Sequence, residues 1–321
     1  MGHIFEGRER PEEASHSLWQ RTLRDSIHCS GVGLHSGKRV SLSLHPAAPD
    51  TGIVFRRIDL DGHPEIPALY DRVGDTRLCT TLVAESGANV GTVEHLMSAF
   101  VGCGVDNAIV ELNATEVPIM DGSAEPFVFL IECAGLVVQS ARRHVVEVLK
   151  TVEVREGDKV ARLDPADGFS IDLGIAFGSS AIGEQNLFVD VTSRAFKDEI
   201  SRARTFGFLH EVEALRAAGL ARGGSLENAV VVAGDQVLNE DGLRYADEFV
   251  RHKILDCIGD LSLAGHGLMA HFSGYCVGHR INNLLLRALF ADAEAWRLRP
   301  APSAVGRINP HLHHTPAAIS A

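Results

Sequence analysis

The chain has 321 residues, of which 45% are hydrophobic and 22% charged, a composition typical of a globular protein and not of a disordered one. Its 30 basic and 42 acidic residues give a formal charge of −12, so we expect no general affinity for nucleic acid or anionic membranes. The six cysteines are scattered singly with no CxxC pair, which is typical of reduced thiols. We therefore expect a cytoplasmic protein.

The sequence predicts no secretion signal and no transmembrane segment. Residues 1–13 are too charged for a signal peptide. The longest apolar run, 127–138, is interrupted by Glu132 and is too short to span a bilayer. We expect a disordered extension over residues 1–18 and a flexible tail over residues 303–321.

Strand patterns dominate the start of the folded region. Alternation of apolar and polar residues, or β-rich composition, predicts strands at 40–44, 52–57, 77–83 and 106–113. A glycine-rich turn at 31–37 contains His35, which a surface loop would explain as well as a functional site would.

Two helices are expected among these strands. Apolar residues at helical spacing predict the first from Thr92, as N-cap, to Val101. Glu94 and His95 then lie in its first turn, where a glutamate also serves ordinary compensation of the helix dipole. The second helix is expected at 124–134.

The pattern starts again near residue 143. Strands are predicted at 145–154, 160–163, 169–176, 187–191, 228–232 and 268–277. Helices are predicted at 209–218, at 247–264 and from the turn at 278–283 through Trp296. Strands followed by helices in each half predict an α+β fold with two domains, 19–142 and 143–302.

The helix at 247–264 carries a polar stripe. His252, Asp256 and Asp260 are spaced four apart, so they lie one turn above each other while Ile254 and Leu255 face the core. A histidine and an aspartate so placed can reach one metal ion. A solvated polar face would explain the same pair.

A catalytic zinc site needs three protein ligands and an open position. His252 and Asp256 supply two, and His95 is the best third, because the neighbouring Glu94 could take a proton from an activated water. Asp260 is then free to hold His279, at a strand-to-helix turn, in its protonated form.

Five strings of residues carry a family resemblance, together with the segments 20–23 and 31–35. The strings are Thr92-Val93-Glu94-His95-Leu96, Pro118-Ile119-Met120-Asp121-Gly122-Ser123, Ser201-Arg202-Ala203-Arg204-Thr205-Phe206-Gly207, His252-Lys253-Ile254-Leu255-Asp256 and Gly278-His279-Arg280-Ile281-Asn282-Asn283. In this order they resemble the UDP-3-O-acyl-N-acetylglucosamine deacetylases, zinc enzymes of the committed step of lipid A synthesis. The resemblance runs from about residue 20 to 299.

The resemblance implies two domains, each a two-layer α/β sandwich, with the active site at their interface. It implies one Zn²⁺ per chain on His95, His252 and Asp256, with Fe²⁺ as the alternative in the cell. Glu94 would be the general base for hydrolysis of the N-acetyl group. His279, partnered by Asp260, would steady the oxyanion and protonate the departing amine.

The resemblance also implies how a monomer would bind an acylated UDP-amino sugar. Thr205 would add a hydroxyl donor to the oxyanion, and Lys253 would hold a polar or phosphate group. An apolar passage for the fatty acyl chain would follow Phe206. The remaining residues assigned to substrate binding are His35, Val212, Ala221, Ser225 and Ala229.

Two other functions fit the same residues. One is a zinc amidohydrolase acting on a different N-acyl sugar, and the other is a sugar-nucleotide-binding protein with a structural metal. Glu94 distinguishes the second, because a closed structural site needs no base and usually has four protein ligands.

Overall fold

The computed structural model describes residues 18–302, so the predictions for the extension and the tail lie outside the described residues except at Leu18. The fold is mixed α+β, which confirms the predicted class. No helix among the described residues is both long and apolar enough to cross a membrane.

Residues 19–142 form two small sheets, a larger sheet and two helices. The larger sheet has the strand order β2-β3-β9-β4-β5, and β4 and β9 are its parallel pair. The elements are β1 (Trp19–Leu23), β2 (Ile27–Val32), β3 (Arg39–Pro46), β4 (Ile53–Arg57), β5 (Glu65–Pro67), the 3₁₀ turn η1 (Tyr70–Arg72), β6 (Val73–Asp75), β7 (Thr81–Val83), β8 (Asn89–Val90), α2 (Glu94–Cys103), β9 (Ala108–Leu112), α3 (Glu125–Ala134) and β10 (Leu136–Arg142).

Residues 143–302 form a second large sheet with helices on one face. Its strand β19 pairs with β13 on one side and with β14 on the other. The elements are β11 (His144–Val148), β12 (Val152–Glu156), β13 (Lys159–Pro165), β14 (Phe169–Ala176), β15 (Glu184–Asp190), α4 (Ser193–Ala195), the π-helical turn η2 (Phe196–Ile200), β16 (Phe206–Phe208), α5 (Leu209–Ala217), β17 (Val230–Ala233), β18 (Gln236–Val237), α6 (Glu248–Ser262), β19 (Gly267–Tyr275), α7 (His279–Ala291) and β20 (Trp296–Pro300).

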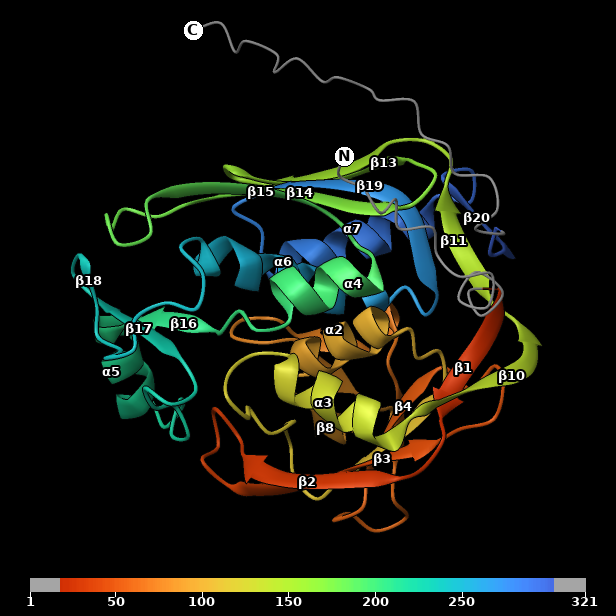
Figure 1. The fold of residues 1–321 in the computed structure, drawn as a ribbon, viewed down its shortest axis with the longest axis horizontal. Coiled ribbons are helices and arrows are strands. Elements are labelled where there is room, and N and C mark those ends of the chain that lie inside the picture. Colours follow the sequence, from red (N-terminus) through yellow and green to blue (C-terminus); the bar gives the residue numbers. More distant parts are fainter. Residues whose placement is uncertain (1–17, 303–321) are drawn as a thin grey trace, which may run out of the picture.

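The two large sheets enclose the helices in successive layers. Figure 1 shows the sheet of β13, β19, β14 and β15 above α6 and α7, then α2 and α3, and then β2 and β3. Strand β3 shows the alternation that produces these layers: Val40, Leu42 and Leu44 are buried, whereas Arg39 and Ser41, on the opposite face, are exposed. The central helices therefore have apolar neighbours above and below.

Helices α2 and α6 approach each other closely at Gly259. A Cβ at this position would overlap the backbone carbonyl of Glu94, so only glycine allows the observed spacing. This contact brings the first turn of α2 against the polar stripe of α6.

The segment between η2 and α6 projects from these layers. Strands β16, β17 and β18 form a small sheet there, and α5 packs against β16 and β17 (Figure 1). We call residues 206–238 the insert.

Some predicted boundaries are wrong for identifiable reasons. Thr92 does not cap α2: its φ is +55°, its hydroxyl has no partner, and Val93 precedes the helix. Helix α7 ends at Ala291, because Asp292 is extended and its side chain accepts a hydrogen bond from the N–H of Glu294. Trp296 instead begins β20.

Two predicted strands are also shorter or divided. The expected strand 145–154 is divided into two strands, β11 and β12, by residues 149–151. The expected strand 77–83 begins only at Thr81. In both cases the apolar pattern continued across residues that the backbone uses to turn.

Candidate active site

The polar stripe of α6 is buried. His252, Asp256 and Asp260 are 3%, 4% and 2% exposed, although they stand on a helix that the sequence alone allowed to be solvated. Burying such groups costs free energy unless they are paired or bind a ligand. The solvated-face interpretation is therefore wrong.

The three predicted metal ligands come together between α2 and α6. One ligand atom from each of His95, His252 and Asp256 lies within 4.8 Å of the other two. The Nε2 atoms of His252 and His95 are 3.3 and 3.6 Å from Asp256 Oδ1, and the two rings are nearly perpendicular. Two histidines and one aspartate are a donor set that proteins use for a catalytic metal.

Hydrogen bonding prepares this set for a cation. His252 donates from Nδ1 to the carbonyl of Ala203 at 3.0 Å, which leaves the lone pair on Nε2. Burial lowers the pKa of His252 to about 4, so its ring is neutral at neutral pH. Asp256 Oδ1 is buried without a hydrogen-bond partner, and a cation would satisfy it. The residues present thus fit a divalent metal.

Lys253 lies beside this group. Its ammonium donates to Asp256 Oδ2 at 2.8 Å. Burial opposes ionisation of the lysine, but the charge of Asp256 and this bond raise its pKa. Burial also opposes ionisation of Asp256, but the charges of protonated His252 and of Lys253 hold its pKa well below the usual range. Because His252 is neutral at neutral pH, Lys253 is the cation that acts there.

Glu94 and His279 face each other across the same space. Glu94 Oε1 is 3.8 Å from His279 Nε2, and His279 donates from Nδ1 to Asp260 Oδ2 at 2.9 Å. Burial opposes protonation of His279, but the charges of Asp260 and Glu94 raise its pKa to about 9. Burial raises the pKa of Glu94, against the charges of His279 and His95. The site therefore places the carboxyl group of Glu94 next to the imidazolium of His279.

The sequence did not point to two residues that hold Asp260. The Thr80 hydroxyl donates to Asp260 Oδ1 at 2.6 Å, and Asn282 Nδ2 donates to Oδ2 at 2.9 Å. Asn282 could have been found, because it lies three residues after His279 and thus on the same face of α7. Thr80 precedes β7, and its sequence neighbourhood carries no functional signal.

The chain is similar to known proteins over most of its length. A family model described as UDP-3-O-acyl N-acetylglycosamine deacetylase matches residues 20–291. Proteins named UDP-3-O-acyl-N-acetylglucosamine deacetylase from Nitrosococcus oceani and Chromobacterium violaceum are 57% and 54% identical to the chain over 281 residues. These matches cover 87% of this chain and 92% of each relative. The chain belongs to this deacetylase family.

Two further residues expected from the deacetylase family, Thr205 and Phe206, are adjacent in the chain, and Phe206 lies beside His252. Thr205 is fixed through its backbone, because its N–H donates to Gly122 and its carbonyl accepts from Val230. The Phe206 ring is 6.2 Å from that of His252 and packs edge-on against Phe249 at 4.9 Å.

The four residues expected to line the acyl-chain passage differ in burial and in their contacts within the insert. Val212 on α5 is partly exposed and lies over Gly207, whereas Ala221 is buried with a φ of +48°. Ser225 is exposed, and its hydroxyl accepts from the N–H of Glu227. Ala229 is half-buried next to β17. Their role as a passage lining stays a prediction.

His35 lies where the insert meets the glycine-rich turn. Its carbonyl accepts a hydrogen bond from the N–H of Arg222, and both its ring nitrogens are buried without partners. The ring lines a cavity of about 260 Å³ that Cys79, Thr92 and Leu220 also line. Burial lowers the pKa of His35 despite the nearby charge of Glu116.

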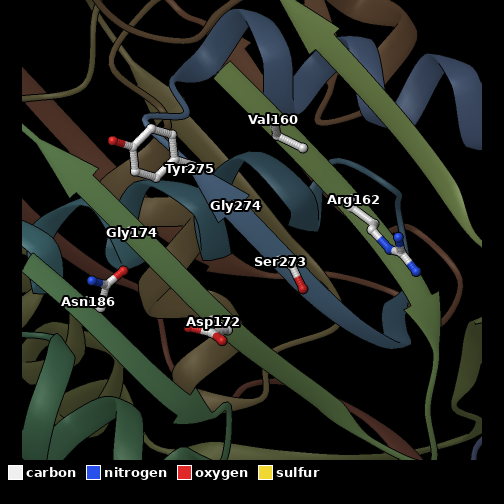
Figure 2. Close-up of a pocket in the computed structure, with 8 residues that line it drawn as sticks. All are labelled: Val160, Arg162, Asp172, Gly174, Asn186, Ser273, Gly274 and Tyr275. Atoms are coloured by element: carbon white, nitrogen blue, oxygen red, sulfur yellow. The ribbon is translucent and has the colours of Figure 1, made fainter. Parts of the chain in front are cut away.

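A second cavity, of about 250 Å³, lies on the open face of the large sheet. Figure 2 shows Arg162, Asp172, Ser273 and Tyr275 on strands with the helices behind them. Ser273 and Tyr275 share one face of β19, whereas Phe272, the residue before Ser273, is fully buried on the helix side. This cavity is therefore separated by the sheet from the residues expected of a deacetylase.

Proposed function

We propose that this protein hydrolyses the N-acetyl group of UDP-3-O-acyl-N-acetylglucosamine and releases acetate, the committed step of lipid A biosynthesis. Membership of the deacetylase family supports the reaction. The observation that carries the proposal for this chain is the buried, unpartnered Asp256 Oδ1, which faces two imidazole Nε2 atoms. Glu94 and His279 stand next to it in the arrangement that acid–base catalysis needs.

We infer that His95, His252 and Asp256 hold one Zn²⁺ per chain, with Fe²⁺ as the alternative. Such a cation supplies Lewis acidity, which polarises a carbonyl group and makes a water molecule more acidic. The neutral His252 and the ionised Asp256 are the protonation states that a metal ligand requires.

Glu94 is the general base in this proposal. Its Oε2 is fixed by the N–H of Thr80 at 3.1 Å, so Oε1 is the oxygen that accepts a proton from the attacking water. Burial raises the pKa of Glu94, which makes its carboxylate a stronger base than an exposed one. The water oxygen adds to the acetyl carbon, and the C–N bond then breaks.

His279 is the acid in this proposal. Its raised pKa keeps it protonated at neutral pH, so Nε2 can first donate a hydrogen bond to the developing oxyanion and then transfer its proton to the departing amine. Asp260 holds the ring through Nδ1. Thr205 would add a second donor through its hydroxyl. Acetate and the free amino sugar are the products, and the proton taken by Glu94 balances the one given by His279.

The substrate would extend from this centre toward the insert. Lys253 would hold a polar or phosphate group, and Phe206 would begin the apolar passage for the acyl chain. The proposed lining and the substrate-facing histidine are Val212, Ala221, Ser225, Ala229 and His35. An insert with partly exposed apolar residues suits an amphiphilic substrate.

The domain organisation, the cellular location and the oligomeric state are also part of the proposal. We propose two domains, 19–142 and 143–302, which contribute Glu94 and His95 from one side and His252, Asp256 and His279 from the other. Scattered single cysteines support a cytoplasmic location, and we propose that the protein acts as a monomer.

Acetate release from the acylated UDP-sugar, with and without a metal chelator, tests this function. We expect release that the chelator abolishes and that added Zn²⁺ restores. Release from other N-acyl sugars at equal rates would favour the broader amidohydrolase function. Binding of the UDP-sugar without acetate release, in protein that contains metal, would favour a structural metal and contradict the proposal.

A further inference from the structure

Thr80 has all three of its polar groups bonded to the active-site helices. It lies immediately before β7 and is 2% exposed. Its hydroxyl donates to Asp260 Oδ1 at 2.6 Å, and its N–H donates to Glu94 Oε2 at 3.1 Å. Its carbonyl accepts from the N–H of Val93, the residue before α2. Thr80 thus contacts Asp260, the partner of the proposed acid, and Glu94, the proposed base. It also contacts the residue before the helix that carries Glu94.

These bonds determine which oxygens face the reacting groups. Asp260 Oδ1 is occupied by the Thr80 hydroxyl, so Oδ2 is left to accept from His279 and Asn282. Glu94 Oε2 is occupied by the Thr80 N–H, so Oε1 is left 3.8 Å from His279 Nε2. Without the hydroxyl, Asp260 Oδ1 would lose its hydrogen bond, so the carboxylate could rotate and the His279 ring would follow it.

We propose that Thr80 is a positioning residue for deacetylation, whose hydroxyl and N–H hold Asp260 and Glu94 so that His279 and Glu94 face the amide together. This inference rests on the roles proposed above for Glu94 and His279. Thr80 itself does not touch the reacting atoms; it acts through two residues that do.

A buried threonine elsewhere in the fold gives a matched control. Thr22 is 5% exposed, and its hydroxyl donates to the carbonyl of Asn107 at 2.7 Å and accepts from the N–H of Ala47 at 2.9 Å. It is buried and hydrogen-bonded as Thr80 is, but its partners are backbone groups and not site residues. A purely structural role would make the two positions behave alike.

The experiment compares Thr80→Val, Thr80→Ser and Thr22→Val in the metal-loaded protein. We expect Thr80→Val to lower kcat by about 10- to 100-fold, the usual effect of removing a partner behind a site residue, with KM and metal content unchanged. Thr80→Ser keeps the hydroxyl, so its kcat should be within about threefold of that of the unmodified protein. Thr22→Val should lower Tm and leave kcat unchanged.

Two results would overturn the inference: a kcat for Thr80→Val within about threefold of the unmodified protein, or a serine variant as impaired as the valine variant. If Thr80→Val does not fold, Thr80→Ala, which introduces no larger group, is measured against the same two criteria.

A double-mutant cycle separates this inference from the proposed function. If Thr80 acts through His279, adding Thr80→Val to His279→Gln should lower kcat by less than about threefold more. The full loss in that background would contradict the inference. If His279→Gln and Glu94→Gln leave kcat unchanged, the proposed roles are wrong; if they lower kcat and Thr80→Val does not, only the role of Thr80 is wrong.

Discussion

Helices α6 and α5 belong to the same half of the chain and use their polar residues in opposite ways. On α6, His252, Asp256 and Asp260 are buried, and each bonds to or faces another site residue. On α5 no residue is buried, and Glu211 and Glu213 face solvent. Since buried polar groups cost free energy unless they are satisfied, the stripe on α6 is where we propose that the chemistry takes place.

The surroundings of the two helices differ in the same way. Helix α6 touches α2 at Gly259 so closely that no side chain fits, whereas α5 packs mainly on the short strands β16 and β17. A segment with few buried contacts opens at lower free-energy cost. The pair α2–α6 should therefore control metal binding and kcat, and the insert should control KM. The following substitutions test that division.

The largest effect should come from His252→Ala. It removes one of three ligand atoms and also the bond to Ala203, so metal affinity should fall by more than the roughly 100-fold that loss of an outer partner costs. Metal per chain after dialysis measures this, and activity should fall with it. The control is His271→Ala. The His271 ring is hydrogen-bonded to the Ser170 hydroxyl in the second large sheet, and this variant should keep its metal. A His252→Ala variant with stoichiometric metal would remove this residue from the ligand set.

Glu94→Gln should retain the metal and lose turnover. Removal of a general base typically lowers kcat by about 10²- to 10⁴-fold. Glu125→Gln is the matched control, because Glu125 also lies in the first turn of its helix but is exposed. Dipole compensation alone predicts equal, small effects at both positions, so similar kcat values in the two variants would refute the role of Glu94 as base.

The pH profile of kcat should change when Asp260 is replaced. His279 has a pKa raised to about 9, so activity that needs the imidazolium should fall as the pH rises through about 9. Stability linked to this group is fully present below about pH 6.5 and is lost over the same rise. In Asp260→Asn the attracting charge is gone while burial remains, so the alkaline limb of the kcat profile should move to lower pH. We expect about a 10- to 100-fold loss of kcat at neutral pH. An alkaline limb that does not move would show that another group titrates there.

Local patterns in the sequence predicted the helices of the site better than their connections. The four-residue spacing of His252 and Asp256 on an amphipathic helix was enough to place both on one face. His95 is predicted as the third ligand only because Glu94 is its neighbour, and the family resemblance supports that choice; spacing could not give it, because α2 and α6 meet only in the folded chain. The bond between Thr80 and Asp260 joins residues 180 positions apart, and no local pattern encodes such a contact.

Backbone geometry explains the predictions that were wrong. Threonine is a residue type that favours the N-cap position, yet the positive φ of Thr92 turns its side chain away from the first N–H groups of α2. Asp292 stops α7 by bonding its own downstream backbone, although the apolar pattern continues to Trp296. In both cases a single residue's backbone conformation overrode a pattern that extended over many residues.

The smallest effect should come from Val212→Ala in the insert. It removes two methyl groups from a partly exposed side chain, and each fully buried methyl contributes about 0.8 kcal/mol, so KM for the acylated substrate should rise by roughly tenfold or less. The kcat should stay within about twofold, because α5 contributes no group to acid–base chemistry. Glu213→Ala on the exposed face of the same helix is the control and should change neither constant. With a substrate that carries a much shorter acyl chain, the KM difference should disappear. A fall in kcat at unchanged KM would mean that the insert takes part in the chemical step, and the functional division between α6 and α5 would no longer hold.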